Sequence, residues 1–502
     1  KKLWGYPELL FQWEWQLGKI LKAQWQKARG QAEQQEAIRA YGRAAGHLET
    51  ARKNYAGTTP TFSKDGENFY LERAELLLEA AKSARGEDKQ NLLKTAIDSI
   101  ESRQEAGLRN YFQDECVTEK SQGGEKRLLQ NNEVLVYMVM FGNRVELIWK
   151  FSSDNDPIQQ ETSKCDSCKD QSLDEKIGNF RKEIAKETWR SDGSSGKLYN
   201  NLSRLFITES FQETLINHRN KIDTVIIVPS NELLRVPFAS LSVGKKLNFN
   251  GDKPYFIYHY AISEPINWKL SGTSLNNGID LEQDPALLAG LAIEPQMSEE
   301  ACLQQQSKSV EIVPGDSRSV CTKPLCYVGK EIEEIGKVIK NRTTLLGKNF
   351  TVGKVRNVFE NNNYSIVHFS THGYFDQYSR NDSWLCTHNR DETLTLDKLE
   401  ELLQGKKVKL LTLSACETAL GAELGLAGIS VKVGTQSALG SLWSVDDKST
   451  SELMRSFYNY LTGENSMARA LQKAQLDLLK RDNFKTPYYW AGFLLIGNWQ
   501  NN

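Results

Sequence analysis

The chain has 502 residues and a mass of 57.0 kDa, which is too long for a single hydrophobic core and predicts roughly three domains. Its 63 lysines and arginines balance 64 acidic residues, so no net field attracts nucleic acid or an anionic membrane surface. No apolar run reaches the roughly 18 to 20 residues of a membrane span. We therefore expect a soluble protein that contacts neither membrane nor nucleic acid directly.

The start of the chain and its cysteines bear on location. The sequence begins at Lys1 without a methionine, which predicts a truncated or processed piece of a longer protein. Eight cysteines spread without regular spacing are typical of a reducing compartment rather than of a disulfide framework, so we expect a cytoplasmic location. Cys165 and Cys168 could begin a zinc site, but zinc normally takes four ligands. We therefore expect no metal and no cofactor.

Residues 1–118 follow a helical pattern. Apolar side chains recur every three or four residues, as at Ala74, Leu77 and Ala81, and breaker-rich stretches such as 56–66 separate these segments. Paired helices of a tetratricopeptide-like solenoid fit this pattern, and an ordinary helical bundle is the alternative. Four tryptophans in the first helices are expected to pack between repeats: Trp4, Trp13, Trp15 and Trp25.

After a polar linker at 119–133, the period changes from helix to strand. VLVYMVMF and VELIWKF flank a Gly142-Asn143 turn and predict a β-hairpin. The polar stretch 152–175 predicts a surface insertion, and 296–324 predicts a second polar excursion. Beyond residue 350, SIVHFST, VKLLTLSA, QSALGSLWSV and GFLLIGN alternate with helical segments. This alternation predicts an α/β fold with a mostly parallel sheet flanked by helices.

Chemistry in such sheets collects at the carboxyl ends of the strands. One strand ends at His372 and the next is followed by Cys416. If these strands are neighbours, the imidazole and the thiol converge as a catalytic pair, and the amides of Gly373 and Cys416 can stabilise an oxyanion. The alternative is that Cys416 is a small buried apolar residue. His368, inside the strand, is expected to belong to the core.

Two further residues lie near this strand in the sequence. His388 and Cys386 follow no predicted strand end, so we interpret both as loop residues without a catalytic role.

Four ordered motifs resemble the CHAT domain, a relative of caspases, separases and gingipains. They are THG after an apolar strand, LSACETALG, GLAGISVKVGTQSALGSLWSVDD and PYYWAGFLLIG. The resemblance is strong over about 325–500, and TVIIVPSNELLRVPFASL resembles the upstream part of the family. It implies an endopeptidase with His372 and Cys416 as its dyad. It also implies a caspase-like fold, with 134–325 as a degenerate half and 326–502 as the active half.

The same resemblance extends to the helical region and to substrate choice. ESRQEAGLRNYFQDEC at 101–116 resembles the link between tetratricopeptide repeats and CHAT domains in cyanobacterial members. LWSVDD resembles a separase pattern, which implies that Asp446 or Asp447 meets a basic residue before the scissile bond. The alternative is that these acids complement the next helix, ahead of a capping box at Ser449 to Glu452.

Two functions follow from these patterns. The first is a cysteine endopeptidase that cleaves a protein substrate and is regulated by a protein partner bound to the helical repeats. The second is a catalytically silent scaffold for protein interactions. Nucleotide binding is not favoured, because the sequence has neither GxGxxG nor a Walker A loop at a strand end. The sequence leaves the oligomeric state open.

Overall fold

A computed structural model forms two compact units, one of Lys1–Gln122 with Asn155–Gln159 and one of Gly123–Asp154 with Gln160–Asn502. The structure describes residues 6–28, 30–54, 63–112, 128–153, 156–190, 196–218, 220–245, 247–248, 253–271, 278–293, 297–307, 317–375, 382–414, 428, 430, 432–464 and 466–501.

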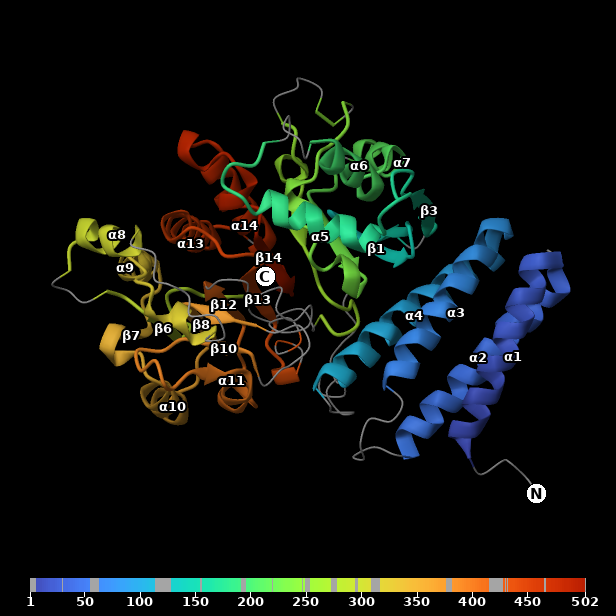
Figure 1. Ribbon diagram of the computed structural model, residues 1–502, viewed down its shortest axis with the longest axis horizontal. Helices are drawn as coiled ribbons and strands as arrows, with labels where there is room; N and C mark the ends of the chain where they lie inside the picture. Colours follow the sequence, from blue (N-terminus) through green and yellow to red (C-terminus); the bar gives the residue numbers. More distant parts are fainter. Residues whose placement is uncertain are drawn as a thin grey trace. The chain divides into compact units, whose positions relative to one another are not determined.

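The first unit is helical, as predicted. Its described residues form α1 (Pro7–Ala28), α2 (Gln31–Asn54), α3 (Ser63–Ser83) and α4 (Gly86–Phe112). Helix α1 packs on α2 and α3 packs on α4 (Figure 1). Each pair is longer than the roughly 34 residues of a tetratricopeptide repeat, so the assignment to that repeat type stays a prediction.

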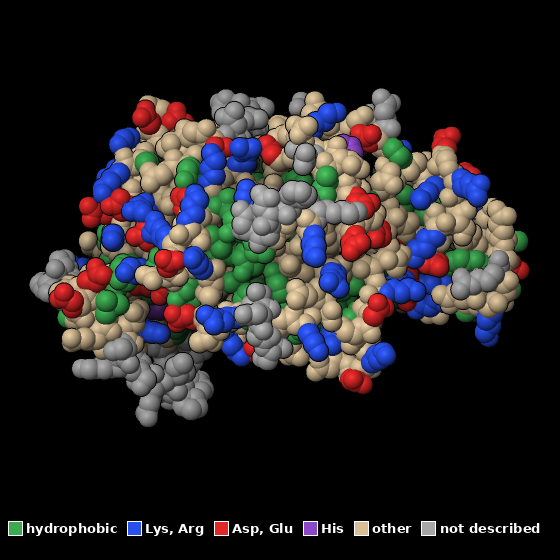
Figure 2. Space-filling model, turned by 90° about the horizontal axis from the view of Figure 1, so that it is seen from above, with side chains coloured by type: hydrophobic (Ala, Val, Ile, Leu, Met, Phe, Trp, Pro, Cys, Tyr) green, Lys and Arg blue, Asp and Glu red, His purple; other side chains and the backbone are tan. Residues whose placement is uncertain are grey.

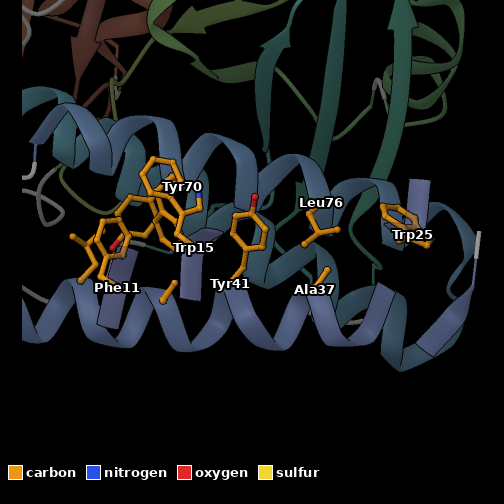
Figure 3. Packing of buried hydrophobic residues seen from close by; sticks show 10 residues of the cluster. Phe11, Trp15, Trp25, Ala37, Tyr41, Tyr70 and Leu76 are labelled. Carbon is orange, nitrogen blue, oxygen red and sulfur yellow. The ribbon is translucent and has the colours of Figure 1, made fainter. Parts of the chain in front are cut away.

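Aromatic residues form the core of this unit. Phe11 and Trp15 of α1 pack with Tyr41 of α2 and Tyr70 of α3 in one buried cluster (Figure 3). Trp15 Nε1 and the Tyr41 hydroxyl both donate to Glu72 Oε2, at 2.7 and 2.9 Å. The cluster therefore buries large apolar surfaces while its polar atoms keep hydrogen-bond partners.

The expectation that all four early tryptophans pack between helices is wrong for one of them. Trp15 and Trp25 are buried, whereas Trp13 is 70% exposed because it lies on the outer face of α1. Trp4 lies outside the described residues.

The second unit begins with a five-stranded sheet. Its strands are β1 (Glu133–Phe141), β2 (Arg144–Phe151), β3 (Gln159–Lys164), β4 (Thr224–Pro229) and β5 (Ala261–Ser263), in the order β3-β2-β1-β4-β5. The predicted hairpin is confirmed: β1 and β2 are antiparallel about Gly142, whose φ of 60° suits glycine. Strand β3 lies inside 152–175, so that segment is not wholly a surface insertion. Helices α5 (Leu173–Ile184), α6 (Gly196–Phe206) and α7 (Glu209–Asn217) belong to the same half.

A six-stranded sheet forms the other half of this unit. It contains β6 (Ala286–Gly290), β7 (Arg342–Leu346), β8 (Ile366–Ser370), β12 (Leu410–Ser414), β13 (Ser437–Ser441) and β14 (Phe493–Gly497), in the order β14-β13-β12-β8-β6-β7. All neighbours are parallel except β13 and β14, which confirms the mostly parallel sheet. Strand β6 pairs with β8, so the six-stranded sheet includes a strand from the segment before residue 325, and the predicted boundary at 325 stays a prediction.

Helices cover both faces of the six-stranded sheet (Figure 1). Helices α9 (Val328–Val338) and α13 (Asp447–Leu461) lie on one face, and α10 (Val352–Asn361) and α11 (Leu396–Leu403) lie on the other. Helix α14 (Met467–Leu479) packs on α13, and α8 (Glu299–Ser307) lies near α9. A small antiparallel sheet of β9 (Gly373–Tyr374), β10 (Trp384–Leu385) and β11 (Leu394–Thr395) follows β8 in the chain.

Surface charge agrees with the balanced composition. Basic and acidic side chains are interspersed over the face in Figure 2. Across the part of the chain that the structure describes, no helix is both long and apolar enough to span a bilayer.

Disulfides contradict the prediction from cysteine spacing. Six of the eight cysteines are paired, as Cys165–Cys168, Cys302–Cys326 and Cys321–Cys386. The pairing of Cys302 with Cys326 and of Cys321 with Cys386 joins segments that are distant in sequence, so spacing alone gave no sign of it. The cytoplasmic location stays a prediction, without the support of the cysteine pattern. Cys116 and Cys416 lie outside the described residues.

Candidate active site

The carboxyl ends of β8 and β12 lie side by side. The two strands are parallel neighbours in which Ser370 pairs with Ser414, and Thr371 N donates to Ser414 O at 3.1 Å. His372 follows Ser370 by two residues, and Cys416 follows Ser414 by two residues. The strands that precede the two predicted dyad residues are therefore in register, although Cys416 itself lies outside the described residues.

His372 is buried and has one ring nitrogen engaged. The residue is 3% exposed, and its Nε2 donates to the backbone carbonyl of Lys323 at 2.8 Å. A carbonyl only accepts, so this contact assigns the proton to Nε2. Nδ1 is buried and has no hydrogen-bond partner among the described residues. The free lone pair on Nδ1 can accept a proton from a donor at this edge of the sheet.

Burial also sets the charge of this imidazole. Removal from water lowers the pKa of His372, the Lys323 carbonyl raises it by a smaller amount, and the Lys323 charge lowers it again. The ring is therefore neutral at pH 7, which is the form that acts as a general base.

Gly373 is placed where a side chain would not fit. A Cβ there would lie 2.9 Å from Leu385 Cδ2 and 3.2 Å from Phe375 Cε2. His372 O accepts from Cys386 N at 2.8 Å, so Gly373 and Leu385 form the next, non-hydrogen-bonded pair of the β9–β10 ladder. In such a pair the amide points away from the partner strand. The Gly373 N–H therefore points away from β10, on the side of β9 where no other described strand pairs.

The segment Cys321–Tyr327, which we call the histidine-contact segment, overlaps the predicted polar excursion at 296–324, but the sequence gave it no part in the site. Its Lys323 carbonyl orients His372, and its Cys321 is bonded to Cys386 of the strand ladder beside His372. A backbone carbonyl has no signature in a sequence. Cys386 lies in a loop, as predicted, but this loop directly follows β10, and the Cys386 disulfide and backbone contact the surroundings of His372. His388 is exposed and its amide donates to Phe350 O.

The two predicted acids have structural partners. Asp446 is the N-cap of α13 and accepts from Ser449 N at 2.7 Å, so the helix begins before the predicted capping box at Ser449. Asp447 Oδ2 accepts from Tyr327 N at 3.0 Å, at the end of the histidine-contact segment. Burial, opposed by backbone hydrogen bonds, raises the pKa of Asp447 to about 7.

His368 occupies the core of the sheet. It is fully buried, its Nε2 donates to Glu331 Oε1 at 2.8 Å, and its Nδ1 lies 3.2 Å from the Tyr458 hydroxyl. Both ring nitrogens are engaged within the core, and His368 is a structural residue.

Comparison with known proteins agrees with this fold. Residues 196–498 match the CHAT domain. The separase–securin complex of Saccharomyces cerevisiae matches with a TM-score of 0.54 at 10% identity, over 93% of this chain and 38% of that chain. The complex of the pro- and mature domains of RgpB from Porphyromonas gingivalis matches with a TM-score of 0.38 at 9% identity, over 64% of this chain and 76% of that chain. No curated protein matches the sequence.

Proposed function

Because the chain belongs to the CHAT-domain family, whose fold it shares with separase, we propose that it is a cysteine endopeptidase with Cys416 as nucleophile and His372 as base. The observation that carries the proposal is the register of β8 and β12, which pairs Ser370 with Ser414, each two residues before one member of the dyad. The Nδ1 of His372, which has no partner among the described residues, supports it, since the Lys323 carbonyl already accepts from the other ring nitrogen.

The reaction is acyl transfer to water. His372 Nδ1 takes the thiol proton of Cys416, and the thiolate attacks the carbonyl carbon of the scissile peptide bond. The amides of Gly373 and Cys416 donate to the oxyanion, a contribution of about 3 kcal/mol for each donor. The His372 imidazolium then gives its proton to the departing amine. Water, deprotonated by the same Nδ1, hydrolyses the thioester and regenerates the thiol.

Substrate choice rests on Asp446 and Asp447. We assign them to a subsite for a basic residue before the scissile bond, because a carboxylate pairs well with lysine or arginine. Asp446 is the better candidate of the two. Each acid already accepts from one backbone amide, Asp446 from Ser449 and Asp447 from Tyr327. Burial raises the pKa of Asp447 to about 7, however, which leaves it only partly charged at neutral pH.

Regulation is proposed to come through the helical unit. Exposed apolar side chains lie along α1, with Trp13 70% and Ile20 57% exposed. Such residues suit contact with a protein partner. The separase structure is itself a complex with securin, so a protein of similar fold binds another protein.

One observation favours the alternative, a catalytically silent scaffold. His372 is only 3% exposed, so a substrate reaches Nδ1 only if the surrounding loops move. Under the endopeptidase hypothesis, binding of a partner drives the movement of these loops.

The test is a proteome-wide comparison of cleavage products between the parent chain and Cys416→Ala, with and without candidate partners. The endopeptidase predicts cuts after lysine or arginine that are all absent from the alanine variant. A parent chain that yields no cuts with any partner, yet binds the same partners, supports the scaffold. Cuts that persist in Cys416→Ala would assign the nucleophile elsewhere.

A further inference from the structure

The Cys321–Cys386 disulfide joins the two segments that hold His372. On one side, Cys321 is two residues from Lys323, whose carbonyl accepts from His372 Nε2 at 2.8 Å. On the other side, Cys386 N donates to His372 O at 2.8 Å, and Thr371 Oγ1 donates to Cys386 O at 2.8 Å. The disulfide therefore fixes the distance between the carbonyl that orients the ring and the strand that carries it.

The contacts around this disulfide confine the effect of opening it to one end of the histidine-contact segment. Cys321 is 8% exposed and Cys386 is fully buried, packed with Trp384, and Leu291 and Val320 pack against this cluster. The far end of the histidine-contact segment has separate anchors, namely the Cys302–Cys326 disulfide and the hydrogen bond from Tyr327 N to Asp447. Opening Cys321–Cys386 thus releases the Lys323 end of the segment while its Tyr327 end stays fixed.

We propose that Cys321–Cys386 is a redox-sensitive positioning site that holds His372 in its working orientation, so that the protease is active with this pair oxidised and weakened when a dithiol reduces it. The inference rests on the proposed function. It assigns to the pair a role that neither the family match nor the fold describes.

The redox step involves a dithiol reductant. One of its thiolates attacks Sγ of Cys321, the more exposed of the two residues, and Cys386 leaves as a thiolate and takes up a proton. The second thiol of the reductant then attacks the mixed disulfide and releases the Cys321 thiolate, which is also protonated. The protein disulfide gains two electrons and two protons, and the dithiol is oxidised to its own disulfide.

Reduction acts on the reaction through the Lys323 carbonyl. Without the disulfide this acceptor is no longer held against Nε2, so the ring proton is free to reside on Nδ1 and the ring is free to turn. Nδ1 then ceases to be a fixed proton acceptor. Cys416 must be a free thiol for catalysis, whereas Cys321 and Cys386 must be bonded to each other. A reductant is therefore expected to favour catalysis by keeping the Cys416 thiol free and to weaken catalysis by opening the Cys321–Cys386 disulfide.

The experiment compares the parent chain with C321S/C386S and with the control C165S/C168S. The control removes a disulfide in a partly exposed turn whose described hydrogen bonds involve Asn143 and Ser167 rather than the site. Two quantities are measured: kcat and KM for a cleaved peptide, and the rate of Cys416 alkylation by iodoacetamide between pH 5 and 9. We expect kcat of C321S/C386S to fall about 10- to 100-fold with little change in KM. Its alkylation profile should shift toward that of H372Q, whereas the control should match the parent.

The alkylation profile distinguishes failure of the proposed dyad from failure of the proposed role of the Cys321–Cys386 disulfide. A parent chain whose Cys416 reacts like that of H372Q contradicts the proposed dyad and, with it, the inference. A parent that differs from H372Q, together with an unchanged C321S/C386S, overturns the inference alone. If C321S/C386S fails to fold, the parent is titrated with dithiothreitol, and mass spectrometry identifies the form with only this pair open. Loss of kcat in that form, reversed by reoxidation, supports the inference, and unchanged kcat overturns it.

Discussion

The buried contact between Glu331 and His368 offers a sharp test of which histidine supports structure and which supports chemistry. Glu331 Oε1 and His368 Nε2 are 2.8 Å apart, and their side chains are 1% and 0% exposed. Glu331→Ala leaves the His368 N–H buried without an acceptor. Leaving such a buried donor without a partner costs up to about 3 kcal/mol. Glu331→Gln keeps an acceptor oxygen, so we expect a smaller loss of about 1 kcal/mol.

The assay is urea unfolding followed by tryptophan fluorescence and far-ultraviolet circular dichroism, with the transition of the second unit compared between variants. A loss below about 1 kcal/mol for Glu331→Ala would show that water or another group replaces the carboxylate. It would refute the assignment of this contact to the dry core of the sheet.

A matched pair of glutamine variants completes this test. In H368Q and in H372Q the new amide nitrogen takes the place of Nε2, so it can still donate to Glu331 Oε1 or to Lys323 O respectively. H368Q is expected to lose stability but to keep peptide cleavage by its folded fraction. H372Q should stay folded and lose cleavage, because it has no basic nitrogen at the place of Nδ1. The reverse pattern would contradict the assignment of roles.

Three further outcomes follow from single contacts. Burial raises the pKa of Glu264 well above its usual value, and its Oε2 has no partner among the described residues. Native stability therefore falls as pH rises above about 4.3, where the unfolded chain releases this proton, and Glu264→Gln should flatten that fall in thermal melts at pH 5 to 8. A parallel pH dependence in both chains would contradict it. Phe69→Ala removes a ring that is 0% exposed from the helical core. It should destabilise the first unit by about 3–5 kcal/mol in urea titration. A loss under about 1 kcal/mol would mean that the cluster in Figure 3 is loosely packed. Since burial lowers the pKa of His372, the acid limb of the pH profile of kcat/KM should lie below pH 6.5. An acid limb above pH 6.5 would contradict a base that is buried as His372 is.

Much of the sheet could be predicted because its strands are short apolar runs. SIVHFST and VKLLTLSA predicted β8 and β12, and their order in the chain suggested the parallel pairing that the register of Ser370 with Ser414 confirms. The turn at Gly142 could also be predicted from the sequence, because glycine accepts a positive φ. These features depend on local sequence.

The contacts around His372 depend on chain segments that meet only in the fold. The Lys323 carbonyl lies 49 residues from His372, and the two longer disulfides span 24 and 65 residues. No periodicity encodes such pairs. The start of α13 was predicted too late because STSE has a capping-box pattern, whereas Asp446 has the extended backbone and the hydrogen bond to Ser449 N that define the N-cap.

A crystal structure of the chain treated with a peptide aldehyde that ends in arginine tests the dyad most directly. We predict a covalent bond from the aldehyde carbon to Cys416 Sγ, with the new oxygen near the Gly373 amide and the sulfur within about 3–4 Å of His372 Nδ1. A bond to any other residue, or a Cys416 sulfur more than about 7 Å from Nδ1 behind packed side chains, would contradict the account.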